Sequence, residues 1–209
     1  MEYFTNEEPL HSKVSVYQIT DHQRRLMQDE IRNLPEQQLK AVPTDRLIGD
    51  IAEKYSINIP VLDESNPSPA RREIDIDMSR DRRHLFVGGP AMQKGTEISI
   101  SVPYTGDREA FHMHASSHVM NYPMGRISKT AITFSRHGIN LDAARVRQEF
   151  DEWLATIKRH LDDMRKELGA FNDALKTEAA AALNTRYEKI KRDDDLLSGL
   201  GFGGPKASQ

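Results

Sequence analysis

The sequence predicts an α+β fold, in which an antiparallel sheet of about four strands packs on helices and is followed by a long amphipathic helix or helical hairpin. Two patterns predict it. Apolar residues alternate with polar ones through much of residues 73–136, as in strands with one buried face. From Val146 onward, apolar residues recur every three or four positions over about four heptads, as in a helix with one buried face.

These patterns and the composition between them divide the chain into four segments. We expect an N-terminal helical segment with a short strand over residues 1–62 and an antiparallel β region over 63–138. A long helical or coiled-coil region over 139–198 and a flexible, glycine-rich tail over 199–209 are expected to follow.

The first segment is expected to hold a short strand at residues 14–16 and two helices. Thr20 and Gln23 have the spacing of a capping box, which predicts a helix that ends before Pro35. A second helix is expected to begin after Pro43, because apolar residues recur there at helical spacing. The residues of that stripe are Leu47, Ile48, Ile51, Ala52 and Tyr55.

The β region begins after residues 63–72, whose Asp, Ser, Asn and Pro content predicts a loop. A run over residues 126–136 changes phase between Ile127 and Ile132, which predicts a strand with a bulge. Three earlier strands are expected, with these apolar residues: Ile74, Ile76 and Met78; Ile98, Ile100 and Val102; Phe111, Met113 and Ala115.

The last helical region carries the strongest pattern in the chain. Asn140 is expected to cap it, and Gly169 marks a place where it could bend or break. A helix of this length would exceed what a small sheet can cover, so we expect its apolar face to pair with itself or with another chain. The predicted interface residues are Val146, Phe150, Trp153, Ile157, Leu161, Met164, Leu168, Phe171 and Leu175.

Composition excludes several classes of protein. The chain has 209 residues, a net charge of −3 and no cysteine, which excludes disulfides, thiolate catalysis and cysteine zinc sites. Its mean hydropathy is −0.66, and no apolar run approaches the roughly 18 residues of a membrane span. Residues 1–8 lack the apolar stretch of a secretory signal, so we expect a cytoplasmic protein.

A histidine cluster suggests one enzymatic alternative, a small metal-dependent hydrolase. His112, His114 and His118 form an H-x-H-x3-H pattern, and two histidines on one strand face can share a metal ion. Asp75 or Asp77, on the polar face of another predicted strand, would add a carboxylate ligand. Histidines at alternating strand positions also occur simply as solvent-facing residues, so our main interpretation contains no metal.

Other motifs indicate no cofactor. Residues 199–204 have the letters of a glycine-rich phosphate loop, but a helix precedes them where a strand is required. The doublets Arg24-Arg25, Arg71-Arg72 and Arg82-Arg83 lack interleaved aromatic residues, and the helix between residues 142 and 195 is close to neutral. A nucleic-acid-binding accessory protein therefore stays an alternative that the sequence does not favour.

Several short motifs resemble, in order, the N-terminal module of a poorly characterised group of bacterial multidomain proteins. They are Y-x-I-x-I-P-V-L at Tyr55–Leu62, I-D-I-D-M-S-R-D at Ile74–Asp81, K-G-T at Lys94–Thr96, V-P-Y-T-G-D at Val102–Asp107, Phe111, N-Y-P at Asn121–Pro123, F-N at Phe171–Asn172 and L-S-G-L-G-F at Leu197–Phe202.

The resemblance implies a β-rich piece with long helices, placed ahead of variable C-terminal domains. Some of those domains resemble restriction nucleases or TIR-type domains, which implies a part in antiviral defence. No catalytic residue is carried over from the group. Since this chain stops just after the last motif, we expect its effector to be a separate protein. The sequence thus predicts a non-enzymatic interaction, oligomerisation or sensor module that forms a homo-oligomer, binds a separate effector, or both.

Overall fold

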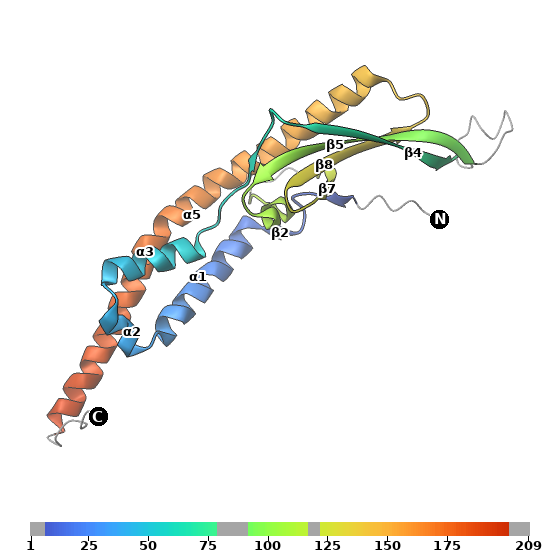
Figure 1. Ribbon diagram of the computed structural model, residues 1–209. Coiled ribbons are helices and arrows are strands. Elements are labelled where there is room, and N and C mark those ends of the chain that lie inside the picture. The colour runs from blue at the N-terminus through green and yellow to red at the C-terminus, as the bar shows by residue number, and fades with distance from the viewer. Residues whose placement is uncertain (1–6, 79–91, 117–121, 201–209) are drawn as a thin grey trace. The chain divides into compact units, whose positions relative to one another are not determined.

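The computed structural model describes residues 7–78, 92–116 and 122–200 (Figure 1). As the sequence predicts, the protein is α+β, with an antiparallel sheet and a long C-terminal helix. The elements in chain order are β1 (Glu8–Pro9), β2 (Val14–Ser15), α1 (Val16–Asn33), α2 (Glu36–Ala41), α3 (Thr44–Tyr55), β3 (Val61–Leu62), β4 (Ser68–Asp77), β5 (Met92–Thr105), the 3₁₀ helix η1 (Arg108–His112), β6 (Met113–His114), β7 (Met124–Ile127), β8 (Ala131–Gly138) and α5 (Ala143–Gly199).

The chain forms two compact units, and each draws on separate parts of the sequence. The first, here called the sheet unit, comprises Met1–Val16 and Asn58–Arg165. The second, here called the helical unit, comprises Tyr17–Ile57 and Lys166–Gln209. Helix α5 therefore contributes its first part to the sheet unit and its last part to the helical unit.

The sheet unit is built on a six-stranded sheet with the order β1-β7-β8-β5-β3, in which β4 also pairs with β5. All of these pairings are antiparallel. Strand β5 is the longest, with 14 residues, and it lies between β8 on one side and β4 with β3 on the other. Its alternating sequence therefore sends apolar and polar side chains to opposite faces of the sheet.

The apolar face of the sheet packs against the first turns of α5. The ring of Phe134 on β8 lies 5.9 Å from that of Phe150 and 5.7 Å from that of Trp153. The indole N–H of Trp153 donates a hydrogen bond of 2.8 Å to the carbonyl of Met124. Aromatic packing and one directed hydrogen bond thus hold α5 against this unit's core.

The polar face of the sheet contains a buried carboxylate. Glu97 on β5 has a relative exposure of 3% and accepts hydrogen bonds from arginines on two other strands. The Nε of Arg72 on β4 donates to its Oε2 at 2.8 Å, and the Nη2 of Arg126 on β7 lies 3.4 Å from its Oε1. Arg126 also donates to the hydroxyl of Ser135 at 3.0 Å. The buried charge is therefore paired, and its partners link strands across the sheet.

In the helical unit, α1, α2 and α3 pack on the last part of α5 (Figure 1). The side-chain amide of Asn172 makes two hydrogen bonds of 3.0 Å with the backbone N–H and carbonyl of Ile57. Arg24 on α1 pairs with Glu178 at 3.0 Å, and its guanidinium lies 5.0 Å from the ring centre of Phe171. These contacts join residues far apart in the sequence.

Three expected boundaries are wrong. Helix α1 begins at Val16, and Thr20 lies inside it, where its hydroxyl donates to the carbonyl of Tyr17. Strand β4 begins at Ser68, within the segment expected to be a loop. Helix α5 is capped by Asp142, whose carboxylate accepts from the N–H of Ala144 at 3.3 Å, and not by Asn140.

Two expected strands are also wrong in conformation. Residues 108–112 form η1, so only Met113–His114 of the run 111–115 is a strand. The odd-numbered residues of that run are nevertheless buried, as predicted: Phe111, Met113 and Ala115. The run 126–136 holds no bulge, because β7 ends at Ile127 and β8 begins at Ala131, which makes a hairpin. Most of the predicted tail lies outside the described residues.

Helix α5 is continuous over its 57 residues and passes through Gly169 without a break. Glycine disfavours a helix by about 1 kcal/mol relative to alanine, so packing of the flanking residues holds α5 in helical conformation at Gly169. No helix in the described parts of the chain combines the length and apolar composition that crossing a membrane requires.

Replacing Gly169 by alanine is expected to stabilise the helical unit by about 0.5–1 kcal/mol, because alanine favours the helix. A Cβ at this position would meet no other heavy atom within 4 Å. Urea denaturation followed by far-UV circular dichroism measures the change. Gly125→Ala is the contrasting control, and it is not expected to gain stability. Its Cβ would lie 3.1 Å from Leu10 Cδ1 and 3.2 Å from Trp153 Cζ2, so these neighbours would have to move. A loss of stability in Gly169→Ala would contradict the prediction.

Candidate functional site

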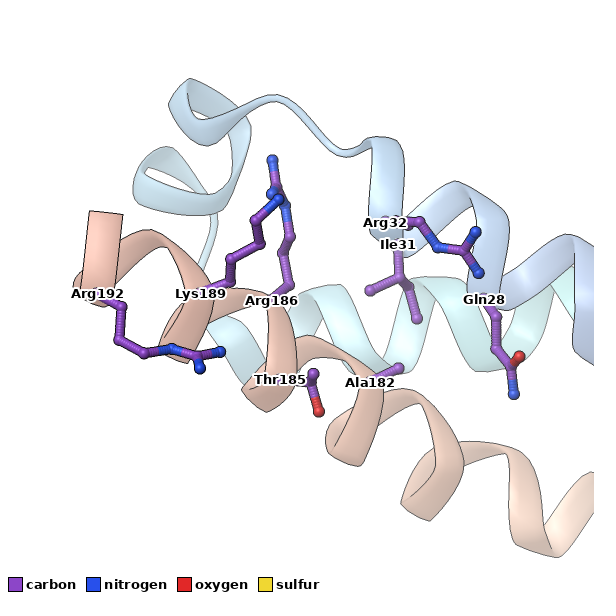
Figure 2. A pocket seen from close by; sticks show the side chains of 8 residues that line it. All are labelled: Gln28, Ile31, Arg32, Ala182, Thr185, Arg186, Lys189 and Arg192. Carbon is purple, nitrogen blue, oxygen red and sulfur yellow. The ribbon is translucent and has the colours of Figure 1, made fainter. Parts of the chain in front are cut away.

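The strongest candidate site is a cavity in the helical unit that we call the basic pocket (Figure 2). Its volume is about 350 Å³. Residues from α1 and α5 line it, and four of the eight are cations while none is acidic. They are Gln28, Ile31, Arg32, Ala182, Thr185, Arg186, Lys189 and Arg192.

Helical spacing explains how these residues come together. On α1, positions 28, 31 and 32 lie on one face, because residues three and four apart are neighbours on a helix. On α5, positions 182, 185, 186, 189 and 192 share a face for the same reason. Where two such faces meet, short side chains at Ala182 and Thr185 leave the space that the longer cationic side chains surround (Figure 2).

Arg186 is a lining residue with a buried hydrogen-bond donor that has no partner in the described structure. Its side chain is half-buried beside the apolar stripe that includes Leu183 and Ile190. Its Nη2 donates a long hydrogen bond of 3.5 Å to the carbonyl of Leu34, and its Nε is buried without a hydrogen-bond partner in the described structure. A buried donor without a partner costs about 1–3 kcal/mol, so an acceptor in the pocket would relieve this cost.

The other cations differ in how far they are neutralised. Arg32 pairs with Asp29 at 3.3 Å. The Nε of Arg192 donates to the carbonyl of Glu188, and Lys189 has no ion pair among the described residues. Three of the four cations thus lack a carboxylate partner in the parts of the chain that the structure describes. The pocket is a positively charged hollow suited to an anion.

A neighbouring tyrosine fixes this end of α5 in place. The hydroxyl of Tyr187 lies 3.2 Å from the carbonyl oxygen of Leu39 and 3.3 Å from the hydroxyl of Thr44. These two bonds tie α5 to the connection between α2 and α3. They hold the adjacent Arg186 and the rest of the pocket's α5 face on a rigid element.

A second cavity, of about 500 Å³, lies in the sheet unit between β5 and the start of α5. Its lining is mainly apolar and includes Ile98, Ile100, Leu141 and Val146. Of the two cations that line it, Arg147 is paired with Asp151 at 2.9 Å, and Arg71 has no ion pair among the described residues. This cavity offers apolar surface and one such cation, so it gives a weaker indication of an anionic ligand than the basic pocket, which has three cations without a carboxylate partner in the described parts of the chain.

The sheet unit also contains a pair of buried histidines. His11 has a relative exposure of 0%, and its ring stacks on that of His160 with centres 4.9 Å apart. Its Nδ1 lies 2.8 Å from the carbonyl of Met113, so Nδ1 carries the proton and donates. Its Nε2 is buried without a partner in the described structure. Burial is the main cause that lowers the pKa of His11 to about 4, so the ring is neutral at pH 7.

The described residues of the predicted metal site make separate contacts. Among the described residues, no group of three or more His, Cys, Asp or Glu side chains is arranged to hold a metal ion. His112 closes η1 and lies 3.0 Å from Glu109 and 3.2 Å from Glu8. The Nδ1 of His114 lies 3.0 Å from the carbonyl of Ala115.

The remaining members of that predicted site add no ligand set. Asp75 on β4 pairs with Lys94 at 2.8 Å. Asp77 ends the same strand, and His118 lies outside the described residues. The prediction assumed that His112 and His114 share one strand face, whereas His112 belongs to a 3₁₀ helix, in which positions do not alternate.

The nine predicted interface residues are all buried within the single chain, with relative exposures of 8% or less. Those from Val146 to Met164 lie in the sheet unit, and those from Leu168 to Leu175 lie in the helical unit. The chain's own elements cover the apolar face of α5, which the sequence did not predict. Self-association of the protein stays a prediction. The apolar face of α5, which was expected to mediate self-association, is buried inside the chain.

The basic pocket was not among the sequence predictions. A signal was present, because R-Y-E-K-I-K-R at Arg186–Arg192 holds four cations in seven residues. Asp193, Asp194 and Asp195 follow directly, so the helix as a whole is close to neutral. The net charge of the whole helix therefore does not reveal the cationic cluster, which is confined to two turns.

Comparison of the chain with protein-family models, with curated proteins and with solved structures finds no match.

Proposed function

We propose that this protein is a non-enzymatic sensor and interaction module whose basic pocket binds an anionic ligand. The observation that carries the proposal is the buried Nε of Arg186. It has no hydrogen-bond partner among the described residues, and the pocket that Arg186 lines contains no acidic residue among them. An anion with several oxygen acceptors would satisfy that donor and neutralise its cationic neighbours.

The proposal extends to the biological setting. The resemblance to N-terminal modules of bacterial multidomain proteins supports a part in antiviral defence together with a separate effector. Three exposed leucines, two in the last turn of α5 and one directly after it, support a contact with another protein or another copy of this chain. They are Leu196, Leu197 and Leu200, with relative exposures of 67%, 56% and 55%.

Inorganic pyrophosphate is the probe that tests the ligand-binding part. We expect the full chain to bind it in isothermal titration calorimetry at moderate ionic strength. Lys189→Glu is expected to weaken binding at least tenfold, because a charge-assisted hydrogen bond contributes about 1.5–3 kcal/mol. Lys189 is exposed and unpaired in the described structure, so the charge reversal should leave the fold intact.

Lys191→Glu is the matched control. Lys191 is exposed on the same helix but does not line the pocket. We expect its variant to bind pyrophosphate within about twofold of the unmodified protein at moderate ionic strength, where distant charges are screened. The absence of any binding, or equal losses in the two variants, would contradict a specific anion site.

A further inference from the structure

The lining of the basic pocket is uneven along α5. Ala182 lies at the N-terminal end of the lined face. Arg186, Lys189 and Arg192 follow it at about 6, 10 and 15 Å along the helix axis, at 1.5 Å per residue. Figure 2 shows these three cations gathered to one side of Ile31 and Ala182, with Gln28 and Arg32 on the other side. The pocket thus has a cationic end, with three cations that lack a carboxylate partner among the described residues, and an opposite end with an amide beside Arg32, which is paired with Asp29.

A ligand that carries several negative charges would be complementary to the cationic end. None of its three cations has a carboxylate partner among the described residues, and Arg32 is the lining cation that has one. A single carboxylate would leave two positive charges uncompensated. A chain of two or three phosphoryl groups supplies about three negative charges in a row and offers acceptors to the planar guanidinium groups.

The opposite end fits a compact organic group. Ala182 provides apolar surface in front of the buried Ile31, and the amide of Gln28 has both donors and an acceptor. The hydroxyl of Thr185 donates to the carbonyl of Ala181 at 3.0 Å, which leaves its oxygen free to accept a hydrogen bond. An apolar surface beside paired donor and acceptor groups matches the face and edge of a nucleobase and the hydroxyls of a sugar.

Size also limits the ligand. The volume of about 350 Å³ lies at the lower end of the roughly 300–1,000 Å³ typical of small-molecule sites. We propose that the ligand of the basic pocket is a single nucleoside di- or triphosphate, with its phosphates at Arg186, Lys189 and Arg192 and its base near Gln28. This inference rests on the proposed function. The phosphates would be held by three side chains of α5, without a glycine-rich loop.

Calorimetry on the full chain, without divalent cations, tests this by comparing ATP, GTP, CTP and UTP with inorganic tripolyphosphate. We expect at least one nucleotide to bind tenfold or more tightly than tripolyphosphate. Gln28→Ala should remove most of that advantage and leave tripolyphosphate binding unchanged. Gln37→Ala, at an exposed position of α2 outside the pocket, should change neither. Lys189→Glu should weaken both ligands.

The outcomes separate this inference from the proposed function. Equal binding of tripolyphosphate and all four nucleotides would overturn the nucleotide assignment and leave the anion site standing. Binding of a single-stranded oligonucleotide in the absence of mononucleotide binding would overturn it in favour of nucleic acid. A protein that binds none of these probes would overturn the inference and the proposed function together.

Discussion

Replacing Leu175 by alanine is expected to destabilise the helical unit by about 2–5 kcal/mol, because it leaves a cavity in a packed core. Leu175 has a relative exposure of 0% and lies on the buried stripe of α5, one turn from Phe171 and one from Ala179. Hydrogen–deuterium exchange of peptides from α1 and α3, together with urea denaturation, measures the loss. These helices should exchange faster, because their packing partner on α5 is weakened.

Leu196→Ala is the matched control on the same helix. Leu196 is 67% exposed, so its truncation should change stability by no more than about 0.5 kcal/mol. Sedimentation of the unmodified protein and of Leu175→Ala tests self-association separately, since Leu196 serves as a control for stability alone. A Leu175→Ala variant that keeps its stability but loses mass would show the stripe to be an interface between copies. A strict monomer at micromolar concentration, alone and with a separately encoded partner, would contradict the proposed association.

Lowering the pH from 7 to 4 is expected to destabilise the sheet unit by about 3 kcal/mol through His11 alone. The pKa of His11 is about 4 in the folded protein, below the usual 6.5, so the unfolded chain binds this proton more strongly. The stabilisation is therefore complete above pH 6.5 and is lost as the pH falls from 6.5 toward 4. The neighbouring imidazoles of His160, His112 and His114 are further causes that lower the pKa of His11.

The fluorescence of Trp153 is a suitable probe, because it is the only tryptophan in the chain and lies in the sheet unit. His11→Asn removes the titrating group and suits a backbone φ of 58°, which asparagine tolerates well. Its stability should be lower than that of the unmodified protein at pH 7, and it should fall less as the pH decreases. The exposed His22→Asn is the control and should leave the pH dependence unchanged. Parallel curves for His11→Asn and the unmodified protein would contradict the role of His11.

Much of the fold could be predicted because its elements repeat a pattern. The stripe from Val146 to Leu175 is buried at every predicted position, since periodic spacing reports directly on one helix face. The β7–β8 hairpin was missed because its turn, Ser128-Lys129-Thr130, contains no Gly, Asn, Asp or Pro to mark it. There the hydroxyl of Ser128 accepts from the N–H of Ala131 and closes the turn instead.

The candidate site was harder to predict because it depends on contacts between distant residues. Arg186 and Leu34 are separated by 152 positions, and nothing in a single sequence shows that they meet. The unsatisfied Nε of Arg186 is likewise a property of packing and not of spacing. The stacking of His11 on His160 has the same origin, since one residue follows β1 and the other lies on α5.

The division of both units across the sequence has a consequence for synthesis of the chain. Helices α1 to α3 leave the ribosome first, but the part of α5 that completes their unit begins at Lys166. At roughly 5–20 residues per second, the intervening stretch of about 110 residues takes on the order of 5–20 seconds to make. During that time, apolar side chains such as Ile31, Leu47 and Ile51 have no α5 to cover them. The nascent chain should therefore depend on chaperones for longer than a protein whose core is contiguous in sequence.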